Sequence, residues 1–326
     1  MIKYRKDEIE ELNRTGFRDT FGKGILEIGE VDPDVIVLAA DLSDATRVTK
    51  FSESFTDRYV QLGIAEQNML SVASGLSLSG KTCFCGSFAT FLTLRGCEQI
   101  RNDICYQNCN VKIVGIDSGL ANGFLGVTHY GLEDIAIARS IPNLLVLSPS
   151  DCLSLAKLLW EIARYKGPVY LRLSGGKSIP VIYKEDREFK IGESVVLEEG
   201  KDISIFATGL MVSEALKAAS ILKKDRIYSK VIDVHTIKPI DTKAIIVAAK
   251  ETELIVAVEE HNLTGGLGSA IAEVIADHGL SSRLLRIGLP DKFIHKYNSH
   301  KALLEKYGLV SKNIVKKIIE GLRKCY

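Results

Sequence analysis

Glu66 is the ionisable residue whose position in the sequence most favours a chemical role. It lies in YVQLGIAEQNMLSVASGLSLSGK, residues 59–81, where an apolar run predicts a strand and the following segment predicts a helix that begins near the glutamate. The helix dipole stabilises a carboxylate in the first turn, so Glu66 could simply start the helix. The motif G-I-A-E-Q-N-M, followed one helix later by the strand and loop GSFATFL, favours a functional carboxylate instead.

Phe91 and His129 are two further residues that could take part in a site. Phe91, in SFATFL, would be an ordinary core aromatic if it stood alone, but its ring could also stack on a flat ligand. His129, in GVTHYGLED, could be a loop histidine satisfied by the backbone, or a proton donor and acceptor, since an unperturbed imidazole has a pKa of about 6.5. Glu133 and Asp134 favour the start of the next helix, where an acid could orient the histidine.

The other cysteine and histidine patterns predict neither a metal site nor a dinucleotide site in this chain. Cys83 and Cys85 have a C-x-C spacing that places both on one face of a strand, and we interpret them as small apolar core side chains. His261 stands in VEEHNLTGGLGSA, whose glycines precede a helix without forming G-x-G-x-x-G. The remaining histidines carry no local pattern.

The candidate residues lie in a chain in which apolar strands alternate with amphipathic helices. Strands are predicted at 35–40, 59–63, 82–88, 111–116, 144–147 and 169–173, with helices that include 67–78, 92–106 and 152–165. The segment 175–190 interrupts this alternation with two glycines, a proline and the charged run KEDREFK. Beyond it, strands are predicted at 203–207, 227–234, 254–258 and 283–287, with helices at 212–222, 242–249, 268–277 and 312–322.

This alternation predicts an α/β protein with a doubly wound, mostly parallel sheet that carries helices on both faces. We expect residues 1–180 to form the first domain and residues 188–326 a second, smaller α/β domain, with an exposed connection between them. Ligands of such sheets bind at the carboxyl ends of the strands. Glu66 follows one of these ends.

The composition limits the classes of function. The 326 residues include 42 basic and 41 acidic side chains, so there is no excess charge for holding nucleic acid or an anionic membrane. No stretch approaches the roughly 20 apolar residues of a membrane helix. The charged start MIKYRKDEIEELNR is unlike a signal peptide, and the seven cysteines do not form a disulfide framework. We therefore expect a cytoplasmic protein.

The motifs around Glu66 and beyond it resemble the C-terminal half of transketolases. The resemblance is strongest over residues 59–151 and extends through VIDVHTIKPID and AVEEHNLTGGLGSAI, so that it covers nearly the whole chain. It is closest to split transketolases, which are encoded as two chains, and it includes deoxyxylulose-phosphate synthase and, more distantly, the beta subunits of pyruvate-dehydrogenase-type decarboxylases. It implies a pyrimidine-binding domain followed by the transketolase C-terminal domain.

The resemblance implies thiamine diphosphate as cofactor and gives roles to several residues. The family's glutamate in the place of Glu66 hydrogen-bonds the pyrimidine N1′, which helps the ring to reach the imino tautomer that removes the proton from C2. Phe91 matches the aromatic that stacks on the aminopyrimidine, and His129 matches a histidine that faces the reacting atoms. Ile64 and Leu94 are further implied cofactor contacts, although many relatives have an aromatic near Leu94.

The motif that holds the cofactor's diphosphate in this family is missing from the sequence. It consists of G-D-G followed by N-N and binds a divalent metal, whereas here Gly-Asp does not occur and no two asparagines are adjacent. The resemblance therefore implies that an N-terminal, diphosphate-binding partner subunit carries most of the Mg²⁺ site, and that the assembly contains two copies of each chain. The implied reaction transfers a two-carbon ketol unit from a ketose-like donor to an aldehyde acceptor.

Two other functions stay open at this point. The chain could belong to a thiamine diphosphate-dependent decarboxylating synthase or to a 2-oxoacid dehydrogenase as its beta-type subunit, which would use the same glutamate. It could also be a non-catalytic binding subunit that retains the fold.

The substrate, a sugar or a ketoacid, is also open, but three positions favour a less polar or unphosphorylated donor. Ile116 and Leu125 stand where relatives bind sugar hydroxyls with polar groups, and Gly175 stands where many have an arginine for the substrate phosphate. Another cation could replace the missing arginine, and the candidates are Arg172, Arg95 and Lys177.

Overall fold

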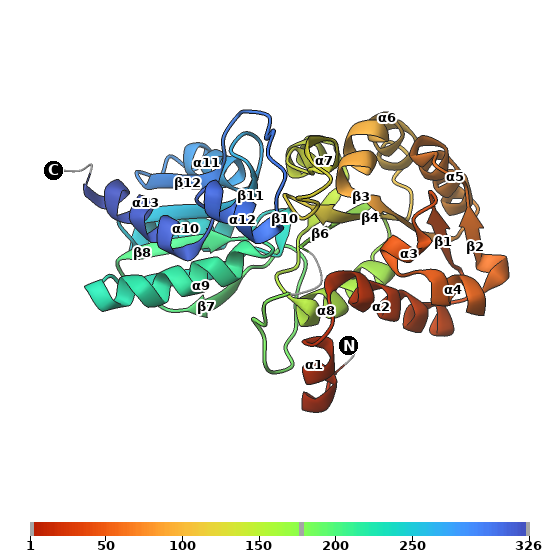
Figure 1. The fold of residues 1–326 in the computed structure, drawn as a ribbon, viewed down its shortest axis with the longest axis horizontal. Coiled ribbons are helices and arrows are strands. Elements are labelled where there is room, and N and C mark those ends of the chain that lie inside the picture. Colours follow the sequence, from red (N-terminus) through yellow and green to blue (C-terminus); the bar gives the residue numbers. More distant parts are fainter. Residues whose placement is uncertain (1–2, 176–178, 324–326) are drawn as a thin grey trace.

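The computed structural model describes residues 3–175 and 179–323, which form two α/β units side by side (Figure 1). The first unit comprises α1 (Lys6–Leu12), α2 (Phe17–Val31), β1 (Val35–Ala39), α3 (Ser43–Thr46), α4 (Thr49–Ser54), η1 (Thr56–Arg58), β2 (Tyr59–Gln61), α5 (Glu66–Leu78), β3 (Thr82–Phe88), η2 (Phe91–Arg95), α6 (Cys97–Gln99), η3 (Ile100–Cys105), β4 (Val111–Ser118), η4 (Val127–His129), α7 (Asp134–Ser140), β5 (Leu145–Leu147), α8 (Cys152–Arg164) and β6 (Val169–Ser174). The second comprises β7 (Val195–Glu198), β8 (Ile203–Ala207), α9 (Met211–Leu222), η5 (Lys223–Asp225), β9 (Ser229–Asp233), β10 (Thr236–Lys238), α10 (Thr242–Glu251), β11 (Leu254–Asn262), α11 (Leu267–Asp277), β12 (Arg283–Leu289), α12 (His300–Lys306) and α13 (Ser311–Arg323).

The strands form two sheets in the described part of the chain. The first is seven-stranded in the order β10-β5-β6-β4-β3-β1-β2, and the second is five-stranded in the order β12-β11-β8-β9-β7. Within the same residues, neighbouring strands are parallel except at the two edges formed by β10 and β7. The predicted fold class, a doubly wound and mostly parallel sheet followed by a smaller α/β unit, is confirmed. No membrane-spanning helix is present among the described residues.

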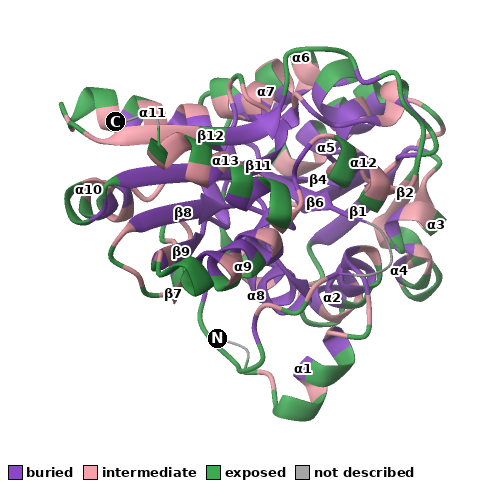
Figure 2. Cartoon of the chain, turned by 60° about the vertical axis from the view of Figure 1, so that its left-hand side comes forward, coloured by how far each residue is buried: buried purple, intermediate pink, exposed green. Residues whose placement is uncertain are grey.

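The two faces of the first sheet pack against different helices, because successive strand residues point to opposite sides. In β1, Val35 and Val37 belong to a core with α2 and α8, whereas Ile36 and Leu38 belong to a core with α5. Figure 2 shows the strands buried between these layers. The continuous apolar runs that predicted the strands are explained by this double coverage.

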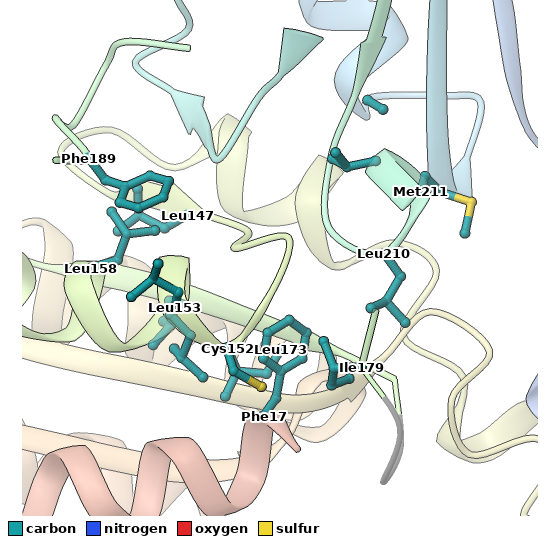
Figure 3. Packing of buried hydrophobic residues seen from close by; sticks show 14 of the residues in the cluster. Phe17, Leu147, Cys152, Leu153, Leu158, Leu173, Ile179, Phe189, Leu210 and Met211 are labelled. Atoms are coloured by element: carbon teal, nitrogen blue, oxygen red, sulfur yellow. The ribbon is translucent and has the colours of Figure 1, made fainter. Parts of the chain in front are cut away.

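One core continues from the first unit into the second. It includes Phe17 and Leu173 from the first unit, Ile179 and Phe189 from the connection, and Met211 at the start of α9 (Figure 3). Strand β10, which follows β9 of the second sheet, returns to pair with β5 of the first sheet. The sequence pattern did not predict this short strand, which ties the second unit to the first through backbone hydrogen bonds.

The connection between the units is partly buried, so the expectation of an exposed connection is wrong for its apolar residues. Tyr183 and Phe189 are 5% and 3% exposed, although the charged residues between them are exposed. The Tyr183 N–H donates to Asp151 at the start of α8, and its hydroxyl donates to Asp233 at the end of β9. A charged run thus predicts exposure only for the residues that carry the charges.

The segment predicted as one helix at 92–106 is divided into π-helical turns η2 and η3, with the short α6 between them. Gly96, at the junction, lies so close to α5 that a Cβ there would approach Leu70 Cδ1 to 2.3 Å. A hydrophobic period of 3.6 residues does not distinguish such π-turns from a regular helix.

A buried ion pair joins β6, α7 and the second unit. Arg172 Nε donates to Asp134 Oδ2 at 2.8 Å, and both side chains are at most 1% exposed. The Tyr170 hydroxyl donates to the same carboxylate oxygen at 2.8 Å, while Arg172 Nη2 donates to the Glu260 carbonyl of β11 at 3.0 Å. Removing one partner of such a pair leaves a buried charge without compensation.

We expect Arg172→Met to lower the free energy of unfolding by about 3–5 kcal/mol, since Asp134 would stay buried without its cation. Arg164→Met is the matched control, because Arg164 is 53% exposed and lies 3.7 Å from Glu161, so its loss should cost less than about 1 kcal/mol. Urea unfolding followed by circular dichroism measures both values. Equal stabilities of the two variants would contradict a structural role for the buried pair.

Candidate active site

Glu66 is the first residue of α5 and lies just beyond the carboxyl end of β2. Gly63, in the intervening turn, has φ of +70°, a conformation that favours glycine. The glutamate is only 1% exposed. A buried carboxylate requires hydrogen-bond donors close by.

Two side chains from the segment after α5 bind the Glu66 carboxylate. The Ser87 hydroxyl, on β3, donates to Oε1 at 3.1 Å, and Arg95 Nη1, at the end of η2, approaches Oε2 to 2.5 Å. Both belong to the strand and loop that the sequence paired with Glu66. The carboxylate is therefore turned toward β3 and η2, a geometry that a residue serving only to start a helix does not require.

A cluster of three rings is linked to this carboxylate through Arg95, whose guanidinium carbon lies 4.4 Å from the Phe91 ring centroid. The Phe91 ring centroid is 5.6 Å from that of Phe88 and 5.2 Å from that of His129, and Phe88 and His129 are themselves 5.6 Å apart. All three contacts are edge-on, which is a favourable arrangement for aromatic rings. The structure thus brings Phe91 and His129 together, as the sequence analysis expected of a shared site.

His129 ends the short 3-10 helix η4, and its loop is held by the second unit. Thr128 Oγ1 lies 3.0 Å from His129 Nδ1. The Tyr130 hydroxyl donates to the carbonyls of Gly123 and Lys296, and Gly126 lies so close to the ring of Tyr297 that a Cβ there would clash with it. The second unit therefore fixes the loop that carries the histidine.

The two acids after His129 have other partners than the imidazole. Asp134 begins α7 and binds Arg172, while Glu133 Oε1 accepts a hydrogen bond from Asn262 at 3.4 Å. Burial raises the pKa of the Glu133 carboxyl. The prediction that both residues start a helix fits these positions better than the alternative in which an acid orients the histidine.

Ile64 and Leu94 border the site as exposed apolar side chains, with exposed fractions of 77% and 53%. Leu94 and Thr128 also line a cavity of about 300 Å³, whose far side is formed by residues of the second unit that include Lys292 and Phe293. Large apolar side chains exposed beside a buried carboxylate are suited to contact with a further molecule.

The donor set fits the pyrimidine half of thiamine diphosphate. Glu66 offers a buried carboxylate, and Phe91 offers a half-buried ring for stacking. Among residues 3–175 and 179–323, no group of three or more His, Cys, Asp and Glu side chains could hold a metal ion. Glu66, Phe91, Ile64 and Leu94 would thus hold the pyrimidine, and these residues provide no evident cradle for a metal-bound diphosphate.

The other sequence candidates lie in the core. Cys83 and Cys85 are fully buried on the α5 side of β3, where burial raises the pKa of the Cys83 thiol to about 12. His261 is also fully buried, at the interface of the two units, and burial lowers its pKa to about 4. Its neighbour Glu259 accepts hydrogen bonds from two backbone N–H groups at the start of α11, which explains the adjacent glycines.

The residues that were expected to influence substrate binding differ in their burial. Ile116 is fully buried, whereas Leu125 is 52% exposed. Arg172 is wrong as a candidate for a substrate anion, because it is buried and paired with Asp134. Lys177 lies outside the described residues.

Sequence reasoning missed the partners of Glu66. Ser87 follows Cys83 and Cys85 at the same spacing of two along β3, so it faces the layer that α5 covers. A serine at such a position needs a hydrogen-bond partner, and this requirement could have pointed to the glutamate that starts α5. Arg95 carried no comparable signal, because the π-helical turn that directs its side chain was not predictable.

Two family models match the chain. The transketolase pyrimidine-binding domain matches residues 14–178, and the transketolase C-terminal domain matches residues 192–314. Together they extend over both units of the structure.

Individual relatives give the same assignment. A putative transketolase C-terminal section of Methanocaldococcus jannaschii is 42% identical, covering 95% of this chain and 97% of the relative. A 6-deoxy-6-sulfo-D-fructose transketolase subunit of Clostridium sp. (strain MSTE9) is 38% identical, covering 94% of each. A solved structure described as an inactive β4 tetramer of a split-gene transketolase is 38% identical with a TM-score of 0.84, covering 94% of this chain and 98% of that one. The chain therefore belongs to the transketolase family, and it resembles the C-terminal subunits of split transketolases.

Proposed function

We propose that this chain is the pyrimidine-binding subunit of a two-subunit transketolase, which transfers a two-carbon ketol unit from a ketose-like donor to an aldehyde acceptor. The observation that carries the proposal is the buried Glu66 carboxylate, whose partner Arg95 lies over the ring of Phe91, which in turn contacts His129. The relatives described as transketolase subunits support the reaction class.

The residues of this chain would have separate tasks in that reaction. Thiamine diphosphate supplies a thiazolium C2 that becomes a nucleophile when it loses its proton. Glu66 hydrogen-bonds the pyrimidine N1′ and thereby sets the protonation of that ring. Phe91 stacks on the pyrimidine and excludes water, while His129 exchanges protons with substrate oxygen atoms.

We assign the diphosphate and its Mg²⁺ to a separate N-terminal subunit, with two copies of each chain in the assembly. The missing G-D-G and N-N motifs support this division. So does the solved relative, which is described as inactive in a tetramer of β subunits. The exposed Ile64 and Leu94 would become covered when the partner completes the site.

We further propose that the donor is less polar than a ketose phosphate, or unphosphorylated. Gly175 has φ of +86°, and a Cβ there would lie 2.5 Å from Leu210 Cδ1, so an arginine at this position would be strained. Ile116 is fully buried and offers no contact to a substrate, and Arg172 is committed to Asp134. The relative described as a 6-deoxy-6-sulfo-D-fructose transketolase subunit supports a donor without phosphate, whereas two other relatives are described as apulose-4-phosphate transketolase subunits.

We expect Glu66→Gln to assemble with the partner subunit but to slow proton–deuterium exchange at C2 of bound thiamine diphosphate by at least about 100-fold, because proton transfer through N1′ would be lost. Exchange is measured by quenching the complex in acid and recording proton NMR. Glu98→Gln, at an exposed glutamate of α6, is the control and should exchange at the wild-type rate. If the Glu66→Gln complex exchanged the C2 proton at the wild-type rate, Glu66 would serve only to start the helix.

We expect hydroxypyruvate to have a higher specificity constant than xylulose 5-phosphate or fructose 6-phosphate, because hydroxyls buried without partners cost about 1–3 kcal/mol each. Steady-state kinetics of the assembled enzyme gives these constants, with pyruvate as a test of the decarboxylase alternative. Leu125→Asp, at a half-exposed position, restores a polar group. It should therefore reduce the difference between the specificity constants for hydroxypyruvate and for the phosphorylated ketoses. If the phosphorylated ketoses are clearly preferred by the wild type, the proposed donor is wrong.

A further inference from the structure

Arg95 makes two contacts that place its guanidinium in the middle of the candidate site. Nη1 lies 2.5 Å from Glu66 Oε2, and the guanidinium carbon lies 4.4 Å from the centroid of the Phe91 ring. The proposed function, on which this inference rests, gives the same two surfaces to the pyrimidine of the cofactor. The arginine and the pyrimidine would therefore need the same space.

Other groups of the chain already contact parts of Glu66 and Phe91. Ser87 binds the second carboxylate oxygen of Glu66, and the residue as a whole is 1% exposed. Phe88 and His129 contact Phe91 edge-on rather than face to face. A planar donor that binds Glu66 Oε2 and stacks on Phe91 in the way that Arg95 does would have to take the place of Arg95.

The chemistry of the two groups is also alike. A guanidinium is planar, stacks on aromatic faces and donates N–H groups to carboxylates in its own plane. An aminopyrimidine is likewise planar and pairs with a carboxyl group through its ring nitrogen while one face stacks on an aromatic ring. Arg95 thus meets the requirements that Glu66 and Phe91 impose on a ligand.

We propose that Arg95 is a positioning residue that occupies the pyrimidine subsite, and that thiamine diphosphate binds by displacing it. The Arg95 side chain is 44% exposed, so its charge can move into solvent without being buried elsewhere. While it is in place, it neutralises the buried Glu66 and keeps Phe91 covered. The apparent cofactor affinity is reduced by the fraction of molecules in which Arg95 fills the subsite.

The test is the dissociation constant of thiamine diphosphate, at saturating Mg²⁺, for the complex of this chain with its diphosphate-binding subunit. Arg95→Ala removes the competitor, and the dissociation constant should fall about fivefold, which corresponds to the upper range of coupling for a partly exposed ion pair. Arg101→Ala is the matched control, because Arg101 is exposed and binds Asn102. Its dissociation constant should equal that of the wild type.

A second measurement separates occupancy of the subsite from a general effect on the fold. Guanidinium chloride at non-denaturing concentration should weaken cofactor binding to Arg95→Ala, because the free ion can re-enter the subsite, while sodium chloride at the same ionic strength should not. Arg95→Lys, which lacks the planar group, should bind the cofactor with intermediate affinity.

Equal or weaker cofactor binding in Arg95→Ala would overturn the displacement proposal, as would insensitivity of this variant to guanidinium. Failure of the proposed function would be visible separately, as no saturable binding of thiamine diphosphate to the wild-type complex or as no ketol transfer in its steady-state kinetics.

Discussion

The buried carboxylate of Glu66 is the interaction on which the organisation of the site depends. A charge that is 1% exposed is tolerated only with donors close by, and here they come from β3 and from the π-helical turn η2. This requirement links the start of α5 to the two elements that follow it. The π-helical turn η2 carries both Arg95, which binds the carboxylate, and Phe91.

The second unit supports the same site through contacts with the first sheet and with the loop that carries His129. Its strand β10 pairs with the edge of the first sheet. Its Lys296 carbonyl accepts a hydrogen bond from the hydroxyl of Tyr130, the residue after His129. The buried pair of Arg172 and Asp134 adds a further polar connection, because Arg172 also donates to the Glu260 carbonyl of β11. The C-terminal domain is therefore part of the scaffold of the His129 loop, in addition to being a separate α/β unit.

The sequence predicted the parallel strands, because buried apolar runs are local signals. Glu66, Phe91 and His129 were identified through the resemblance to transketolases, and their roles are proposals. The sequence did not predict β10, which has three residues, or the burial of Tyr183, since both depend on contacts with remote segments. Ser87 and Arg95 were missed as partners of Glu66 for the same reason. Side-chain pairing across elements follows from packing geometry, on which a single sequence carries little information.

We propose that this chain provides the pyrimidine half of a cofactor site that is divided between two subunits. Titration calorimetry with thiamine diphosphate and Mg²⁺ tests it most directly, first on this chain alone and then on its complex with the diphosphate-binding subunit. We expect no measurable complex with the single chain. Once both subunits are present, we expect saturable binding of one cofactor for each copy of this chain. A complex of micromolar affinity or tighter with the single chain would contradict the proposal.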